Sequence, residues 1–210
     1  MKKRTAVIGT LVSLIPMGQT LVIGTGAALT STAVMLTVPE IAQAESARYY
    51  NNLGIEKAKL GDNHGAISDF NKAIKLNSNY HLGYYNRGKV KNNLGDYQGA
   101  FSDFNKAIEI KPNLVEAYLF RGNVKVRLND DYYGAISDFN KAIELNPRYS
   151  EAYYNRGFTK NELKDSYGAI SDYNKAIEIN PSYASAYENR GIIKEEIGDM
   201  KGACSDWRKA

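Results

Sequence analysis

One sequence phrase recurs through most of this chain at a nearly constant spacing, and it limits the folds that the chain can adopt. The phrase GAISDFNKAI occupies residues 65–74 and returns unchanged at residues 134–143. Close variants begin at Gly99, Gly168 and Gly202, so that successive copies start 34 or 35 residues apart. A period of this length predicts a repeat architecture, in which each unit is too small to bury its apolar face alone and stacks on its neighbours.

Each unit shows the pattern of two helices joined by a short turn. In residues 150–183, Tyr153 and Gly157 lie four positions apart, as on one helical face, and Ala169 and Tyr173 repeat this spacing in the second half of the unit. An aspartate precedes every second helix at the position of an N-cap, namely Asp62, Asp96, Asp130, Asp165 and Asp199. The pattern therefore predicts an all-α fold made of about five helix pairs.

A glycine stands in the middle of every predicted first helix, where it costs about 0.5–1 kcal/mol relative to alanine. These glycines are Gly54, Gly88, Gly122, Gly157 and Gly191. We expect them to allow close approach of the second helix, which brings small residues of its own: Ala66, Ala100, Ala135, Ala169 and Ala203. The sequence offers no account of the other repeated glycine, which opens the phrase GAISD.

Residues 1–44 differ in composition from the rest of the chain. Lys2, Lys3 and Arg4 precede a run without any charged residue, 5–39, and the segment ends in Ala42-Gln43-Ala44. A positive start, an apolar middle and an A-x-A end predict an export signal that is cleaved after Ala44.

The apolar run is longer than the core of most export signals, so an uncleaved membrane anchor within residues 5–38 is the alternative. In both cases the rest of the chain is predicted to lie outside the cytoplasm, in a periplasm, a lumen or the cell envelope.

From about Ala47 to its end the chain resembles the tetratricopeptide repeat (TPR) family. That family's pattern places one aromatic residue before the glycine of the first helix, and an alanine, a second aromatic and another alanine in the second helix. The first aromatics here are Tyr50, Tyr84, Tyr118, Tyr153 and Tyr187. The second aromatics are Phe70, Phe104, Phe139, Tyr173 and Trp207, and the closing alanines are Ala73, Ala107, Ala142, Ala176 and Ala210.

The resemblance implies a right-handed α-solenoid of about five tandem helix-turn-helix repeats, preceded by the apolar signal or anchor helix. The TPR domain would occupy residues 45–210, with repeats at about 47–80, 81–114, 115–149, 150–183 and an incomplete 184–210. The wording of the repeats, behind an export signal, is similar to that of exported bacterial members, including cyanobacterial ones.

Two positions depart from the family pattern. The leucine before the first-helix glycine is kept only as Leu53; it is arginine at positions 87, 121, 156 and 190, and the family's tyrosine is lysine in all five units. Because a buried arginine needs a partner, we expect each arginine to pair with the aspartate of the preceding unit: Asp69–Arg87, Asp103–Arg121, Asp138–Arg156 and Asp172–Arg190. Asp206 would then lack a partner. The alternative is an arginine exposed to solvent.

Residues that carry catalysis or bind metals are scarce. His64 and His81 are the only histidines, Cys204 is the only cysteine, and neither zinc-ligand spacing nor a phosphate-binding glycine loop occurs. The net charge of +4 is spread between interleaved acidic and basic residues rather than gathered in a basic patch. We therefore expect no enzyme activity, no metal, no cofactor and no nucleic-acid partner.

The resemblance implies that the first helices line a concave groove, which gives candidate ligand-binding positions. They are Tyr85, Asn86, Lys89, Phe120, Asn123, Arg127, Tyr154, Asn155, Phe158 and Asn189. Asn52, Asn86, Asn155 and Asn189 would form a row of amides that can pair with the backbone of an extended peptide. Phe120 is either a binding hot spot in this row or a core residue.

Two functions remain open from the sequence. The first is a non-catalytic scaffold outside the cytoplasm that holds a peptide or a partner protein in its groove. The second is an accessory module of an envelope enzyme system that binds a glycan or cell-wall polymer through tyrosines and asparagines. The family's lysine–asparagine–arginine clamp for a partner's terminal carboxylate lacks its lysines here, which argues against docking to a cytosolic chaperone.

Overall fold

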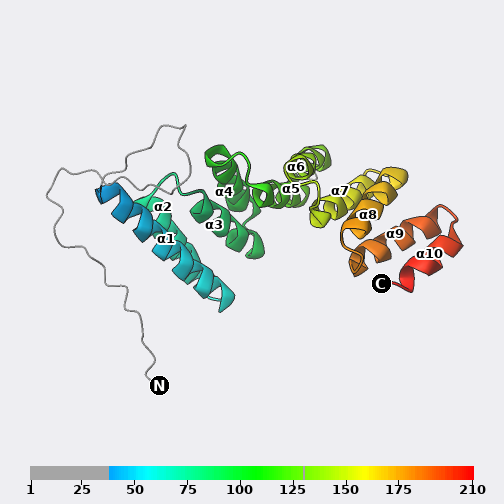
Figure 1. The fold of residues 1–210 in the computed structure, drawn as a ribbon, viewed down its shortest axis with the longest axis horizontal. Coiled ribbons are helices and arrows are strands. Elements are labelled where there is room, and N and C mark those ends of the chain that lie inside the picture. Colours follow the sequence, from blue (N-terminus) through cyan, green and yellow to red (C-terminus); the bar gives the residue numbers. More distant parts are fainter. Residues whose placement is uncertain (1–37, 130) are drawn as a thin grey trace, which may run out of the picture.

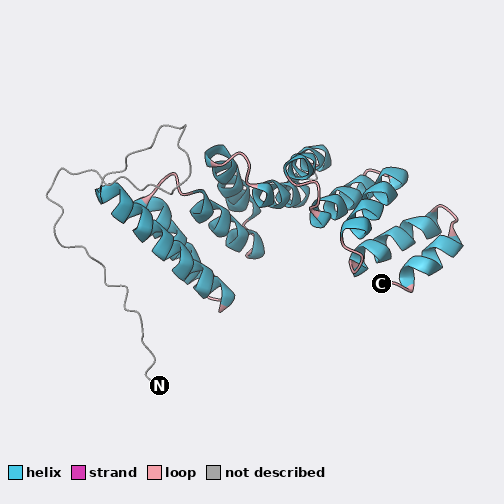
Figure 2. Ribbon diagram, viewed as in Figure 1, coloured by secondary structure: helices cyan, strands magenta, loops and turns pink. Residues whose placement is uncertain are grey.

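The structure, a computed structural model, describes residues 38–129 and 131–210. These residues form ten α-helices and no strand, as predicted (Figure 2). The helices are α1 (Val38–Lys59), α2 (Asn63–Leu76), α3 (His81–Asn93), α4 (Tyr97–Ile110), α5 (Val115–Asn129), α6 (Tyr132–Leu145), α7 (Ser150–Glu162), α8 (Ser166–Ile179), α9 (Ala184–Glu196) and α10 (Met200–Trp207).

Most of the predicted export signal or anchor, residues 1–37, lies outside the described residues. No described helix is long and apolar enough to span a membrane.

Consecutive helices form hairpins, and the hairpins stack side by side into an elongated solenoid from α1 and α2 to α9 and α10 (Figure 1). Each second helix contacts its own first helix and the first helix of the following unit. In addition, α1 contacts α3, α3 contacts α5, and α5 contacts α7. The first helices therefore lie side by side, and the surface that they share is called the inner face below.

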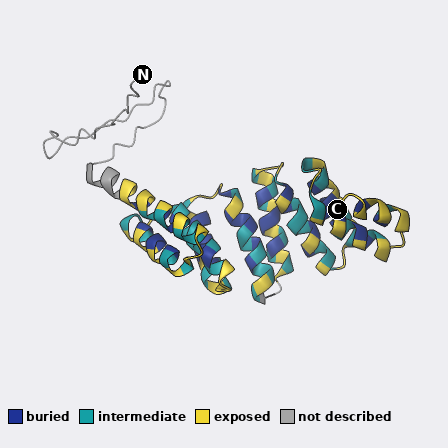
Figure 3. Cartoon of the chain, turned by 90° about the horizontal axis from the view of Figure 1, so that it is seen from below, coloured by how far each residue is buried: buried dark blue, intermediate teal, exposed yellow. Residues whose placement is uncertain are grey.

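The core consists of alanines and aromatic rings where the helices of a hairpin meet, seen as the dark blue segments in Figure 3. The first-helix glycines make room for these rings. A Cβ on Gly122 would lie 2.6 Å from the ring of Phe139, and one on Gly54 would lie 2.7 Å from the ring of Phe70. The predicted close approach of the second helix is confirmed, but in these two pairs the nearest group is the aromatic ring and not an alanine.

The predicted N-caps are confirmed in four units and corrected in the third. The side chains of Asp62, Asp96, Asp165 and Asp199 accept hydrogen bonds from the backbone N–H three residues later. In the third unit Asp131, and not Asp130, accepts from the N–H of Gly134 at 2.9 Å. The extra residue of this unit precedes the capping aspartate in the sequence. The aspartate therefore stands three residues before the glycine, as in the other four units.

This cap also explains the glycine that opens each copy of GAISD. In every unit an added Cβ at that glycine would overlap the carboxylate of the capping aspartate. The glycine therefore permits the close hydrogen bond that satisfies one of the free N–H groups at the start of the second helix.

The turn within each hairpin contains a residue in the left-handed region in four units. Gly61, Gly95 and Gly198 have φ values of 83°, 82° and 89°, and the fourth unit has Lys164 with φ of 63°. A residue with a Cβ is disfavoured in this region, whereas glycine is not.

Replacement of Lys164 by glycine is therefore expected to raise the free energy of unfolding by about 0.5–1 kcal/mol. Urea denaturation followed by circular dichroism measures this change. Lys201→Gly is the matched control, because Lys201 lies in helix α10 and should lose stability on the same substitution. Equal losses in the two variants would contradict the argument.

The arginines pair differently from the prediction. Arg87 donates from Nε and Nη2 to Asp103 of its own unit, at 2.9 and 2.5 Å, and from Nη1 to Asn71 of the preceding unit. The same arrangement recurs at Arg121–Asp138, Arg156–Asp172 and Arg190–Asp206, with Asn105, Asn140 and Asn174 as the partners in the preceding unit. The predicted pairs Asp69–Arg87, Asp103–Arg121, Asp138–Arg156 and Asp172–Arg190 are therefore wrong. The reason is geometric, since the aspartate faces the first helix of its own hairpin.

The repeated lysine completes each of these clusters. Lys57, Lys91, Lys125, Lys160 and Lys194 lie 2.6–2.9 Å from the aspartates of their own units. Asp206, for which the sequence suggested no partner, is held by Arg190 and Lys194. Burial alone would raise the pKa of Asp206, but hydrogen bonds from these two cations outweigh it and hold the pKa below its usual value.

In the first unit the buried aspartate is also paired with two cations, although no arginine is present. Leu53 stands in its place, and Asp69 is paired with Lys57 at 2.6 Å and with Lys72 at 3.0 Å. Burial raises the pKa of Asp69, and the hydrogen bonds from the two lysines more than offset that effect, so the pKa is lowered.

Candidate functional site

A cavity of about 500 Å³ opens on the inner face across three consecutive first helices, α3, α5 and α7. Its walls carry aromatic, amide and aliphatic side chains and one guanidinium. The lining residues are Asn92, Phe120, Asn123, Val126, Arg127, Tyr154, Asn155, Phe158 and Thr159. Because the cavity spans the second, third and fourth units, it exists only when these units are stacked.

The helical period explains how one wall of the cavity is formed. Phe120, Asn123 and Arg127 lie at positions i, i+3 and i+7 of α5, which place them on one side of the helix. Arg121 and Lys125 lie on the other side and bind Asp138 of α6. The helix thus divides its residues between a side that binds the second helix and a side that lines the cavity.

Phe120 packs against other aromatic rings and also lines the cavity, and its predicted role as a binding hot spot stays a prediction. Its ring stacks on Phe104, with 5.7 Å between centroids and 23° between planes, and meets the edge of Tyr85 at 5.9 Å. The ring is only partly buried and also lines the cavity. Phe158, on the opposite wall, is 44% exposed and therefore offers apolar surface to a ligand.

Two basic side chains border these aromatic groups. The Nζ of Lys89 lies 5.5 Å from the ring centroids of both Tyr85 and Phe120. The guanidinium of Arg127 lies 5.8 Å from the ring centroid of Tyr97 and 3.5 Å from its hydroxyl. Among the described residues, neither cation forms an ion pair with a carboxylate.

The predicted row of amides is partly used within the chain. Asn86 donates to the side-chain oxygen of Asn51 at 2.9 Å, and Asn189 donates to the hydroxyl of Tyr154 at 3.0 Å. Asn155, in contrast, lines the cavity together with Asn123. The amides that line the cavity are therefore Asn92, Asn123 and Asn155, one from each of the second, third and fourth units, and the four predicted amides do not form one open row.

The structure brings six of the ten candidate residues together around the cavity: Phe120, Asn123, Arg127, Tyr154, Asn155 and Phe158. Tyr85 and Lys89 adjoin it through Phe120, and Asn189 adjoins it through Tyr154. Asn86 points instead to the first unit. Thr159 also lines the cavity and was not predicted from the sequence. Its hydroxyl donates to the backbone carbonyl of Asn155, as is common for a threonine within a helix.

The tyrosines at and beside the cavity are uncharged. Burial raises the pKa of Tyr85, and nearby Glu116 adds to the effect. Burial also raises the pKa of Tyr154, against a smaller opposing effect of the hydrogen bond from Asn189. Both tyrosines therefore remain neutral hydroxyls at neutral pH. Across the described helices, no group of three or more His, Cys, Asp or Glu residues is placed to hold a metal ion.

Solved structures of known proteins share this fold. MamA is 28% identical with a TM-score of 0.68, and the match covers 74% of this chain and 91% of MamA. YrrB, described as a TPR protein with an unusual peptide-binding site, is 23% identical with a TM-score of 0.65, covering 82% of this chain and 90% of YrrB. PilF of Pseudomonas aeruginosa is 16% identical with a TM-score of 0.74, covering 80% and 76%.

No curated protein matches this chain in sequence. Tetratricopeptide repeat family models match residues 47–80, 81–114, 115–149 and 150–183, which together leave no gap from 47 to 183. With this match and the stacked helix hairpins, the chain belongs to the tetratricopeptide repeat family.

Proposed function

We propose that this protein is a non-catalytic interaction scaffold that holds an extended segment of a partner protein against its inner face. The observation that carries the proposal is the cavity across α3, α5 and α7, which combines exposed aromatic surface with amides. The ion-paired side chains, such as Arg121 and Lys125, point away from this cavity into the hairpins. Asn123, Asn155 and Phe158 line the cavity, take no part in these ion pairs and are available to a ligand.

The chemistry of the cavity suits a peptide. The side-chain amides of Asn123 and Asn155 each donate and accept hydrogen bonds, as the backbone of an extended peptide requires. Phe120 and Phe158 offer apolar surface for one anchoring side chain of the partner. YrrB, which has the same fold at low identity, is described as having a peptide-binding site, so this architecture is compatible with such a ligand.

The proposal places the protein outside the cytoplasm. This part rests on the sequence of residues 1–44, with its basic start, long uncharged run and A-x-A end. Sequencing the N-terminus of the mature protein tests it. A mature chain that begins at Glu45 supports export with cleavage, and an intact chain that fractionates with membranes supports the anchor. An intact chain that stays in the cytosol contradicts both.

Site-specific photo-crosslinking tests the binding function. A benzoylphenylalanine in place of Phe158 lies in the cavity, whereas one in place of Tyr133, which is 77% exposed in the first turn of α6, is the matched control. Crosslinked protein adducts are expected from position 158 and not from position 133.

The substitution Asn155→Ala in the Phe158 probe variant should reduce the adducts, because it removes an amide from the same wall. Equal adducts from both probe positions, or retention of the protein on purified cell-wall polymer without any protein adduct, would contradict the proposal. The second result would favour a polymer-binding module.

A further inference from the structure

The Lys and Arg residues of the first helices fall into two groups, those that form ion pairs and those that do not. Helices α3, α5, α7 and α9 carry ten Lys and Arg residues, and eight of these form ion pairs with the second-helix aspartate of their own unit. Lys89 and Arg127 are the exceptions in these four helices, since they contact aromatic groups and form no ion pair among the described residues. Both also border the cavity. Their charges are therefore not neutralised by a carboxylate of the described chain.

Four glutamates of α7 and α9 carry negative charge that is likewise not paired. Glu162, Glu188, Glu195 and Glu196 are exposed, and none of them forms an ion pair in the part of the chain that the structure describes. By contrast, Glu109, Glu144 and Glu178 of the second helices are paired with lysines at 2.6–2.7 Å. Like the first four, Glu151 of α7 is exposed and has no ion pair among the described residues, as is also true of Glu116 of α5 and Glu45 of α1, so that α7 and α9 together carry five such glutamates, α5 carries one and α3 carries none.

The repeat register places four of the glutamates of α7 and α9 on the inner face: Glu162, Glu188, Glu195 and Glu196. Glu162 and Glu196 follow the first-helix glycine by five residues, as Arg127 does. Glu195 occupies the position of Val126 in its own unit, and Glu188 occupies that of Tyr154. Because Arg127, Val126 and Tyr154 all line the cavity, the equivalent positions of the next units face the same side.

The inner face is consequently polarised along the solenoid. Lys89 lies on α3, Arg127 and the unpaired Glu116 lie on α5, and the unpaired charged side chains of α7 and α9 are all glutamates. The unpaired charge therefore changes from positive at α3 to negative at α7 and α9, along the face that contains the aromatic cavity. Resting on the proposed function, we infer that the partner segment is dipolar. It places an apolar or aromatic side chain in the cavity, its acidic residues toward Lys89 and Arg127, and its basic residues toward Glu195 and Glu196.

Charge complementarity also limits other occupants. A nucleic acid or an anionic lipid surface presents a continuous row of negative charges, which the four glutamates would repel. A neutral glycan would leave both sets of charges unused. A dipolar peptide uses both, and the opposite ends of the groove fix the direction in which it lies.

Selection from a phage-displayed library of random linear peptides on the full chain tests this inference without a known partner. The enriched peptides should carry an acidic cluster and a basic cluster on opposite sides of an apolar residue. For a synthetic peptide of this kind, Lys89→Gln with Arg127→Gln should weaken the Kd about tenfold, as expected for the loss of two exposed ion pairs. Glu195→Gln with Glu196→Gln should have a similar effect.

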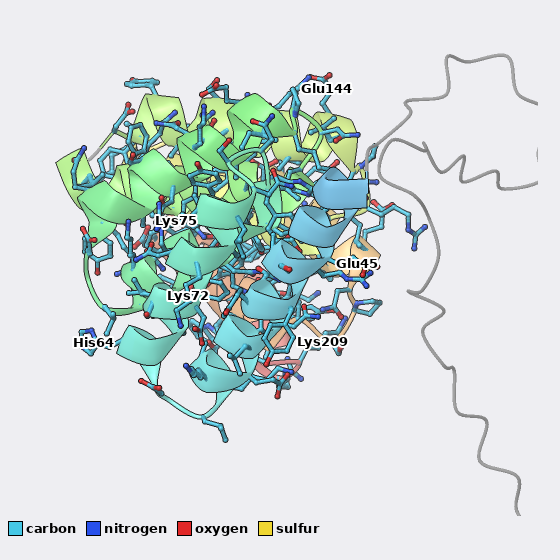
Figure 4. The ribbon with its side chains drawn as sticks, turned by 90° about the vertical axis from the view of Figure 1, so that its left-hand side faces the viewer. Glu45, His64, Lys72, Lys75, Glu144 and Lys209 are labelled. Carbon is cyan, nitrogen blue, oxygen red and sulfur yellow. The ribbon has the colours of Figure 1, made fainter. Side chains whose placement is uncertain are left out.

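The matched control is Lys75→Gln with Glu45→Gln. Both residues are exposed on the first hairpin, on α2 and α1 respectively, and neither forms an ion pair among the described residues (Figure 4). This double variant should bind the peptide as the parent chain does. A charge-swapped chain with Lys89→Glu, Arg127→Glu, Glu195→Lys and Glu196→Lys should prefer the peptide in which the acidic and basic clusters are exchanged.

The results separate the two proposals. Enriched peptides that lose binding on Phe158→Asp but show no charge asymmetry would overturn the dipolar inference and leave the groove function standing. Enrichment that does not depend on Phe158 would overturn the groove function itself. A charge-swapped chain that keeps the original peptide preference would also contradict the inference.

Discussion

Replacement of Phe139 by alanine is expected to lower the free energy of unfolding by about 3–5 kcal/mol. The ring is fully buried in the central unit and fills the space that Gly122 leaves open, so its loss creates a cavity between α5 and α6. The substitution also destabilises the adjacent units, because the stability of a repeat protein depends on the contacts between neighbouring units. Urea denaturation of the full chain, followed by circular dichroism, measures the change.

Trp207→Ala is the matched control, since Trp207 occupies the same position in α10 and also packs against a first-helix glycine, Gly191. Its side chain is 40% exposed, so less apolar surface returns to water when it is removed. We expect roughly half the loss found for Phe139→Ala. Equal losses at the two positions would mean that burial in the stack does not set the contribution of this aromatic position.

The sequence predicted the helices, their pairing and the family because these depend on local periodicity. Spacings of three and four residues define helical faces, and a period of 34 residues sets the length of a hairpin. Gly122 and Phe139 could be assigned to the core because each recurs at one position in every unit. Repetition thus made the packing residues recognisable without any coordinates.

The pairing of the arginines could not be predicted in the same way. A residue such as Asp103 recurs in every unit, so the repeat pattern alone does not say whether it faces its own hairpin or the next one. The choice depends on the rotation of each helix within the hairpin, which places Asp103 toward Arg87 and Asn71 toward the following unit. The incorrect N-cap at Asp130 has a simpler cause, because the inserted residue could be placed on either side of the cap.

The candidate site was only partly accessible to sequence reasoning. Side chains on the inner face were identified as those not used for packing, and Phe120 and Phe158 do line the cavity. Their partners were not foreseen, since Asn86 and Asn189 are bonded within the chain. Such contacts depend on the spacing between adjacent first helices, which a single unit does not encode.

Asp138→Asn is expected to lower the free energy of unfolding by about 2–4 kcal/mol. The buried carboxylate accepts two hydrogen bonds from Arg121, at 2.9 and 2.5 Å, and lies 2.9 Å from the Nζ of Lys125. An asparagine cannot neutralise either cation and presents an NH₂ group to one of them. The expected loss of unfolding free energy is smaller than for a fully buried ion pair, because both cations are partly exposed to solvent. The exposed fraction of the side chain is 19% for Arg121 and 18% for Lys125.

Two comparisons show whether charge pairing causes this loss. Arg121→Leu copies the first unit, in which Leu53 stands at this position and lysines alone hold the aspartate, so it should cost less, about 1–2 kcal/mol. Glu144→Gln, at the surface residue labelled in Figure 4, removes an exposed ion pair with Lys141 and should change the free energy of unfolding by less than about 1 kcal/mol. If urea denaturation gave Asp138→Asn the same small effect as Glu144→Gln, the Asp–Arg–Lys cluster would not stabilise the hairpin. If Arg121→Leu cost more than Asp138→Asn, the bridge from Arg121 to Asn105 of the preceding unit would be the stronger contribution.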